Sequence, residues 1–189
     1  MNSIISPRPE VLTPAPDRAI HVIQGESAVS DEPNVYFSTV LGSCIAACLY
    51  DPAAKVGGMN HFLLAESVDS LDGDLKYGVH AMECLINSLL RSGARRSSLV
   101  AKVFGGARLI SGVSDIGRKN VIFIKTFLEN ENIPCLSHSV GGERARRVKF
   151  WPTTGSAKQL LLEVSESVSV ERRPKRAAPK PAGGDLELF

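Results

Sequence analysis

One stretch constrains the fold of this chain more than any other. It begins with Val35–Val40, a run of β-branched and aromatic residues typical of a strand. Gly42-Ser43-Cys44 interrupts this run, and a second apolar run follows from Ile45 to Tyr50. Asp51-Pro52 is a turn signal, and a returning strand is predicted over Met59–Leu64. We therefore expect a strand, a tight bend, a buried strand, a turn and a strand that runs back.

The returning strand carries His61, and it is expected to bring this residue beside Cys44 at the bend. A thiol has an ordinary pKa of about 8.5 and becomes a good nucleophile only after losing its proton. An adjacent imidazole can take that proton, and the thiolate can then attack an acyl carbon. At such a bend, the backbone N–H groups of Ser43, Cys44 and Ile45 are candidate donors for an oxyanion.

A third group is needed to orient the imidazole. Ser38 and Thr39 are hydroxyl residues at the end of the first strand, so a Cys-His-hydroxyl site is predicted. The residues alone leave a second interpretation open. Cysteine is among the most buried residue types, and a histidine in an apolar strand is usually a core residue with satisfied hydrogen bonds.

The exact strings in this region resemble the CheD family, the chemoreceptor glutamine deamidases of bacterial chemotaxis. The resemblance covers roughly Ile20 to Leu162, with several ungapped motifs in the family order. These motifs are LGSC, CLYDP, GGMNHFLL, YGVHAMECLINSLL, AKVFGGA, IGRKN and GGERARRVKF.

The resemblance implies a cysteine amidohydrolase that converts receptor glutamine side chains to glutamate and releases ammonia. It makes Cys44 the nucleophile and His61 the general base, with no metal and no organic cofactor. The third catalytic residue of the family is a threonine six positions before the cysteine. This chain has Ser38 there, with Thr39 next to it as the alternative. A second departure is Ser139, which stands where the family often has an aspartate before a glycine pair.

The implied partners are the cytoplasmic domains of methyl-accepting chemoreceptors, with a CheC-type chemotaxis phosphatase as a further candidate. The product glutamate would be a site for a methyltransferase, which links the reaction to chemotactic adaptation. A rival hypothesis is a non-catalytic module that docks on receptors or on the phosphatase. A hydrolase of small free amides is a third option, disfavoured because the sequence has no ligand-recognition motif.

Composition limits the other classes of function. The 189 residues include 43% hydrophobic and 22% charged residues, as in ordinary globular proteins, and a net charge of +2 gives no case for binding nucleic acid. The four cysteines lack CxxC spacing, which argues against zinc or a disulfide framework and favours reduced thiols. No apolar run reaches membrane-spanning length and no signal peptide precedes the domain, so we predict a cytoplasmic protein without membrane insertion.

The domain organisation follows from proline content and periodicity. We predict a disordered arm over residues 1–17, one domain over 18–166, and a disordered basic, proline-rich tail over 167–189. Within the domain, we predict helices at Tyr77–Arg91 and Asp115–Asn130, the first with Cys84 in its core face. Acidic residues 65–75 and polar residues 25–34 are expected to be loops. Further strands are predicted at Arg18–Gln24, Ser97–Phe104, Ile133–Val140, Arg147–Phe150 and Lys158–Val164.

These elements predict an α+β fold of layered sheets with helices on the outside. The family resemblance adds the expectation of an αββα-type sandwich of mixed sheets in a single domain.

Overall fold

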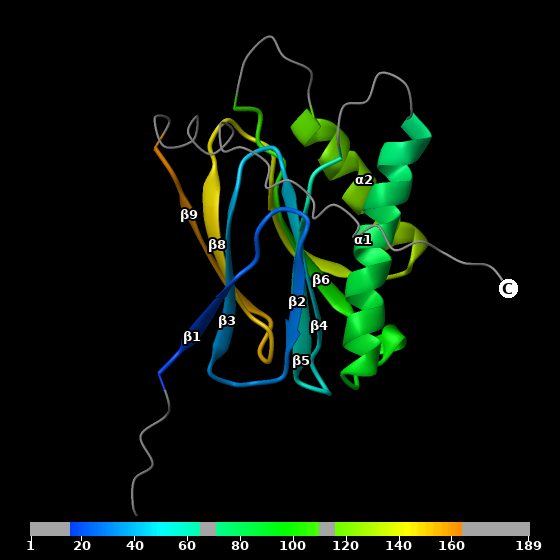
Figure 1. Ribbon diagram of the computed structural model, residues 1–189, viewed down its shortest axis with the longest axis vertical. Coiled ribbons are helices and arrows are strands. Elements are labelled where there is room, and N and C mark those ends of the chain that lie inside the picture. The colour runs from blue at the N-terminus through cyan, green and yellow to red at the C-terminus, as the bar shows by residue number, and fades with distance from the viewer. Residues whose placement is uncertain (1–15, 65–70, 110–115, 164–189) are drawn as a thin grey trace, which may run out of the picture.

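The computed structural model describes residues 16–64, 71–109 and 116–163. Within these ranges the chain forms nine strands, two α-helices and one short 3-10 helix, arranged in three layers (Figure 1). A four-stranded and a five-stranded sheet pack face to face, and both helices cover the outer face of the five-stranded sheet. The predicted α+β class with layered mixed sheets is therefore confirmed.

The four-stranded sheet has the order β1-β3-β8-β9. These strands are β1 (Arg18–His21), β3 (Val35–Leu41), β8 (Arg146–Trp151) and β9 (Ser156–Leu161). β1 runs parallel to β3, and the other neighbours are antiparallel. β3 and β8 lie in the middle and alternate between a face buried against the other sheet and an outer face, as strands with period two do.

The five-stranded sheet has the order β2-β5-β4-β6-β7. Its strands are β2 (Ser27–Ser30), β5 (Val56–Phe62), β4 (Ile45–Asp51), β6 (Val100–Gly105) and β7 (Cys135–Val140). Every residue of β4 and β5 is buried, because the four-stranded sheet covers one face and the helices cover the other. Burial on both faces explains why these strands read as continuous apolar runs without alternation.

The helices are amphipathic and present one apolar face each. α1 (Leu71–Arg91) and α2 (Ile116–Asn130) are separated by the 3-10 helix η1 (Arg96–Ser98) and β6. Gly93 ends α1 with a φ of +95°, a conformation in which glycine avoids the steric cost of a side chain. The buried side chains of the helices are Met82, Leu85, Ile86 and Leu89 on α1, and Phe123, Ile124, Phe127 and Leu128 on α2.

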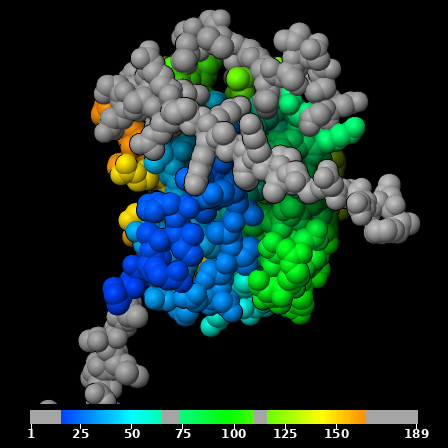
Figure 2. All heavy atoms as spheres, viewed as in Figure 1, coloured from blue at the N-terminus to red at the C-terminus, as the bar shows by residue number. Residues whose placement is uncertain are grey.

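Two hydrophobic cores hold the layers together. The first lies between the five-stranded sheet and the helices, where the ring centroids of Phe62 and Phe123 are 5.6 Å apart in an edge-to-face arrangement. The second lies between the sheets, where Phe37 and Phe150 stack at 6.5 Å. Figure 2 shows one face of the packed molecule, with the N-terminal strands and the helix layer side by side.

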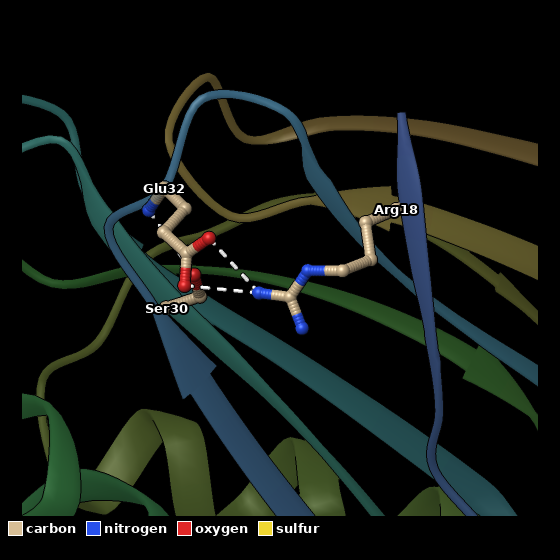
Figure 3. Close-up of polar contacts among 3 residues, drawn as sticks. All are labelled: Arg18, Ser30 and Glu32. Carbon is tan, nitrogen blue, oxygen red and sulfur yellow. Dashed lines mark hydrogen bonds and ion pairs between the residues drawn. The ribbon is translucent and has the colours of Figure 1, made fainter. Parts of the chain in front are cut away.

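An exposed ion pair joins β1 to the connection that enters β3 (Figure 3). Nη2 of Arg18 donates to both carboxylate oxygens of Glu32 at 2.9 Å, and the Glu32 N–H donates to Oγ of Ser30 at 3.1 Å. The backbone N–H of Arg18 also donates to the carbonyl of Asn34 at 2.6 Å. Because the pair is solvent-exposed, its energetic contribution is about 0–1 kcal/mol, and the parallel ladder contributes the larger share of the attachment.

Apart from shifts of a few residues at the ends of other elements, the structure differs from the predicted elements at two places. Residues 25–34, predicted as a loop, contain the edge strand β2, which pairs with Gly57 and Gly58 of β5. A Cβ on Gly58 would lie 2.8 Å from the Ala28 carbonyl, so this close pairing depends on a glycine in the partner strand and not on the β2 sequence. α1 begins at Leu71 rather than at Tyr77.

Cys84, predicted to pack in the core, is exposed and lies 3.5 Å from Nε2 of His80 one turn earlier. The apolar face of α1 is narrower than the predicted face and leaves this position in solvent. Both described helices lie on the five-stranded sheet, so the layers run sheet, sheet, helices in the described part of the chain. The predicted arm and tail fall, except for residues 16 and 17, outside the described residues and stay predictions.

Candidate active site

Cys44 lies at the point where the chain crosses from one sheet to the other. β3 belongs to the four-stranded sheet and β4 to the five-stranded sheet, and the Gly42-Ser43-Cys44 bend joins them. Two backbone hydrogen bonds fix this bend. The Gly106 N–H donates to the Cys44 carbonyl at 2.7 Å, and the Ala107 N–H donates to the Gly42 carbonyl at 2.8 Å. The FGGA segment at the end of β6 therefore supports the half-buried Cys44.

Gly105, at the end of β6, lies in close contact with the backbone of Cys44. Its φ is +113°, and a Cβ built on it would lie 2.0 Å from the Cys44 carbonyl oxygen. Both the backbone conformation and the space exclude a side chain. The Gly141 N–H donates to the Gly105 carbonyl at 2.9 Å, so the glycine pair after β7 supports the same strand end.

Asn120 is a second support that the residue patterns did not identify. It lies on the apolar face of α2 and is fully buried. Its Nδ2 donates to the carbonyls of Ser43 at 3.2 Å and Ile116 at 2.9 Å, and its Oδ1 accepts from the Leu64 N–H at 2.8 Å. The sequence contains one signal for it, since Asn120 lies midway between Ile116 and Ile124, four positions from each, on the apolar face of the helix. A polar side chain on such a face is buried, and a buried amide requires hydrogen-bond partners. Asn120 ties α2 to the bend and to the end of the His61 strand.

The register of β4 and β5 places His61 near Cys44. Ala46 pairs directly with His61, and both face the core between the sheets. Cys44, two residues before Ala46, packs against the same core. It is therefore the diagonal neighbour of His61, a relationship with a typical Cα spacing of about 7–8 Å that long side chains can bridge. The predicted approach of these two residues, seventeen positions apart, follows from this pairing.

Two acceptors set the orientation of the His61 ring. Nδ1 lies 2.9 Å from Oγ1 of Thr39 and 3.3 Å from the Val22 carbonyl oxygen. A carbonyl oxygen can only accept, so we assign the proton of the neutral imidazole to Nδ1. Nε2 then carries the lone pair. Among the described residues Nε2 has no hydrogen-bond partner although it is buried, so it is the ring atom left for accepting a proton.

Burial lowers the pKa of His61 to about 4, and the Val22 carbonyl and the charge of Glu26 oppose this shift only weakly. The cause is desolvation, which disfavours the charged imidazolium. At neutral pH the imidazole is therefore uncharged in the resting structure, with a free lone pair.

Thr39, the alternative in the predicted site, is the hydroxyl residue that contacts His61. It pairs with Val148, a member of the core between the sheets. Ser38, named first in that prediction, pairs with the exposed Lys149 on the outer face of the same strand, where it is nevertheless only 6% exposed. β3 approaches the site from the other sheet, and its inward positions are the odd-numbered ones.

The segment that enters β2 covers the site and was predicted only as a strand end and loop. The Gly25 N–H donates to the His61 carbonyl at 2.7 Å, and the His61 N–H donates to the Glu26 carbonyl at 3.0 Å. The Cys44 thiol lies 3.6 Å from Oε1 of Gln24 and donates to it. A Cβ on Gly25 would be 3.8 Å from the Tyr77 hydroxyl of α1. Burial raises the pKa of Tyr77, and the neighbouring Cys44 adds to the rise.

The predicted oxyanion donors are the backbone N–H groups of Ser43, Cys44 and Ile45. The Cys44 carbonyl points to β6, where it accepts from Gly106. In a planar trans peptide the following N–H, that of Ile45, points the opposite way, toward β5. The Ile45 N–H is therefore directed into the five-stranded sheet and is the least suited of the three to bind an oxyanion.

Ser139 is bound by a buried cation. Nη1 of Arg146, a side chain only 3% exposed, donates to Oγ of Ser139 at 3.1 Å and to its carbonyl, and Nη2 donates to the Gly141 carbonyl. This chain thus has a neutral serine as partner of the Arg146 guanidinium at the position where the resemblance leads us to expect an aspartate. Desolvation lowers the pKa of Arg146.

Two surface hollows lie away from Cys44 and His61. One of about 450 Å³ is formed by the end of α2 and the start of β7, and one of about 200 Å³ by the glycines after β6 and β7. Neither is lined by Cys44 or His61. The described ranges hold no group of three or more His, Cys, Asp or Glu side chains suited to a metal ion. In the same ranges no helix has the length and apolar character to cross a membrane.

The half-buried thiol, the neutral imidazole with an open Nε2 and the hydroxyl on Nδ1 have the components of a cysteine hydrolase site. Comparison with known proteins then defines the family. The CheD family model, described as chemotactic sensory transduction, matches residues 63–159. This chain belongs to the CheD family.

Two relatives of the chain carry the same name. A protein of Caulobacter sp. (strain K31) is 54% identical over 90% of this chain and 92% of its own, and one of Agrobacterium fabrum is 50% identical over 91% and 97%. Both are named "Probable chemoreceptor glutamine deamidase CheD". Among solved structures, the hypothetical protein YfiH of Bacillus licheniformis is similar with a TM-score of 0.43 and 14% identity, over 66% of this chain and 60% of that chain.

Proposed function

We propose that this protein is a chemoreceptor glutamine deamidase, a hydrolase that converts glutamine side chains of methyl-accepting receptors to glutamate. The proposal is supported by family membership and by one observation in particular. The ring of His61 is held through Nδ1 by Thr39 and Val22, which leaves Nε2 as the proton acceptor near Cys44. A core histidine with satisfied hydrogen bonds would have used both ring nitrogens.

The proposed reaction begins with a neutral pair, because burial keeps His61 uncharged in the resting protein. As the substrate carboxamide binds, the thiol of Cys44 gives its proton to Nε2 and the sulfur attacks the amide carbon. The negative charge that develops on the amide oxygen is stabilised by backbone N–H groups at the bend, those of Ser43 and Cys44. The new thiolate beside the ring favours the imidazolium electrostatically, which offsets the desolvation.

The tetrahedral intermediate collapses when the imidazolium of His61 returns its proton to the leaving nitrogen, and ammonia departs. The thioester that remains on Cys44 is hydrolysed by a water molecule whose proton His61 accepts. The products are a glutamate side chain and the free thiol. Thr39 keeps Nδ1 engaged throughout, so that the ring presents the same nitrogen in both halves of the reaction.

The proposed substrate region is the helical cytoplasmic domain of a chemoreceptor, and the reaction is accordingly assigned to the cytoplasm. A CheC-type phosphatase stays a proposed second partner. The rival function, a docking module without catalysis, needs no reactive thiol. Ammonia release from a purified receptor cytoplasmic fragment separates the two, with Cys44→Ala as the test variant and Cys84→Ala, an exposed thiol on α1, as the matched control.

In this assay we expect activity for wild type and for Cys84→Ala, and none for Cys44→Ala. His61→Ala should lower turnover by about 10²–10⁴-fold, the usual contribution of a positioned acid–base group. If a folded Cys44→Ala protein still releases ammonia, the proposed mechanism is wrong.

A further inference from the structure

The side chain of Gln24 brings a primary carboxamide to the thiol of Cys44, with Oε1 3.6 Å from Sγ. This is the functional group on which the enzyme is proposed to act. We propose that Gln24 is an internal substrate mimic, which occupies the carboxamide position of the site in the free protein and is displaced when a receptor glutamine binds. This inference rests on the proposed function, because it identifies that site's occupant.

The backbone on both sides of Gln24 is fixed to the catalytic histidine. Val22 accepts from the imidazole, the Gly25 N–H donates to the His61 carbonyl, and the Glu26 carbonyl accepts from the His61 N–H. These bonds prevent the loop from moving away without disturbing His61. The Gln24 side chain itself is exposed, so its χ angles can rotate it out of the site without any change in the backbone.

The contact explains why Gln24 is a mimic and not a substrate. The thiol donates its proton to the carboxamide oxygen, and hydrogen bonds to a carbonyl oxygen prefer to lie near the amide plane. Nucleophilic attack requires the sulfur above the carbon of that plane, with the proton on His61. A thiol bonded to Oε1 keeps its proton and points at the wrong atom, so Gln24 lowers the reactivity of Cys44 in the free protein.

The test compares Gln24→Leu, which keeps the size of the side chain but removes the amide, with wild type. Two quantities are measured: the rate at which iodoacetamide alkylates Cys44 without receptor, and KM and kcat for a receptor cytoplasmic fragment. Ile23→Ala, an exposed neighbour on the same loop, is the matched control, and the exposed Cys84 is an internal standard for alkylation.

We expect Gln24→Leu to speed alkylation of Cys44 and to lower KM, each by about two- to fivefold, the equivalent of one weak hydrogen bond. The value of kcat, the rate at Cys84 and all parameters of Ile23→Ala should stay unchanged. A higher KM in Gln24→Leu would overturn the inference, since Gln24 would then contact bound substrate. So would unchanged alkylation of Cys44, or Cys44-dependent conversion of residue 24 to glutamate found by mass spectrometry.

The two readouts distinguish this inference from the proposed function. Alkylation needs no receptor, so faster labelling of Cys44 in Gln24→Leu together with no deamidation by wild type would support the masking contact and refute the function. Normal deamidation with unchanged alkylation and KM would refute the mimic and leave the function supported.

Discussion

Oγ1 of Thr39 lies 2.9 Å from Nδ1 of His61, and the two residues belong to different sheets. Thr39 is on β3 of the four-stranded sheet, whereas His61 is on β5 and Cys44 leads into β4 of the five-stranded sheet. The proposed catalytic geometry is therefore set by the packing of the two sheets across their common core. Changes that shift this packing should affect the site even when they touch none of its residues.

The first prediction concerns this hydroxyl. Thr39→Val keeps the shape but removes the bond to Nδ1, and we expect turnover to fall by about two- to tenfold, the equivalent of one hydrogen bond. Thr39→Ser should retain most of the activity because the hydroxyl remains. Ser38→Ala should be close to neutral, since Ser38 lies on the outer face of β3. Steady-state deamidation of a receptor fragment measures all three.

A damaging Ser38→Ala together with a silent Thr39→Val would contradict this assignment. The departure from the family threonine at position 38 would then matter for function, and the contact seen at Thr39 would be structural only.

The second prediction concerns the order in which the thiols react. Burial strongly raises the pKa of Cys48, so this thiol should stay unlabelled by iodoacetamide in the folded protein. Cys84 and Cys135 are exposed and should label at ordinary rates, with Cys135 slower because burial of its sulfur raises the pKa. Cys44 should react faster than either, since the neutral His61 accepts the thiol proton as the sulfur attacks the reagent.

Peptide mass spectrometry after short exposure to the reagent gives this order. His61→Ala is the control, and it should reduce the rate at Cys44 to that of Cys84 or below. Labelling of Cys44 that is slower than that of Cys84 in wild type would argue against an activated nucleophile.

The third prediction concerns stability against pH. The pKa of His61 is lowered from 6.5 to about 4 in the fold, so between these values the unfolded chain binds a proton that the native state does not. Stability from this group is complete above pH 6.5 and is lost as the pH falls toward 4, by about 3 kcal/mol in total. Urea unfolding at pH 7, 6, 5 and 4 should show the loss.

His61→Gln should remove most of this pH dependence, whereas His138→Gln, at an exposed histidine of β7, should leave it in place. An equal slope in wild type and His61→Gln would mean that His61 is not held neutral by burial.

The fourth prediction concerns Gly105. Gly105→Ala places a Cβ 2.0 Å from the Cys44 carbonyl in addition to straining a backbone with φ of +113°, and we expect a loss of about 3 kcal/mol or more together with reduced activity. Gly93→Ala is the matched control. Its φ is +95° with nothing within 4 Å, so strain alone should cost about 1–2 kcal/mol. Equal losses by urea unfolding would show that the contact with Cys44 is not tight.

Local pattern was sufficient for most of the elements. Val35–Val40 became β3, Ile45–Tyr50 became β4, and the apolar spacing after Asp115 became α2. These segments have strong periodicity or continuous apolar runs. Such patterns indicate which residues are buried, and these residues are buried in the structure. β2 was missed because SAVS has little pattern of its own, and it is a strand only because Gly58 lets it approach β5.

The candidate site likewise has some residues that the sequence predicts and some contacts that only the structure shows. The sequence by itself determined the nucleophile and base candidates, because the Gly42-Ser43-Cys44 bend and the returning strand with His61 are local features. Which of Ser38 and Thr39 contacts His61 was decided by the tertiary structure. One residue of offset in a strand reverses the face, and only the packing of β3 against the other sheet shows which face is inward.

The roles of Asn120 and Gln24 could not be predicted from the sequence pattern, for a related reason. Each contacts the Gly42-Ser43-Cys44 bend through a side chain from a distant segment, α2 for Asn120 and the loop after β1 for Gln24. Hydrogen bonds act over about 3 Å and depend on where the layers place those segments in space. The spacing of apolar residues contains no information on such a contact. Only the tertiary structure therefore shows which residues support and cover the site.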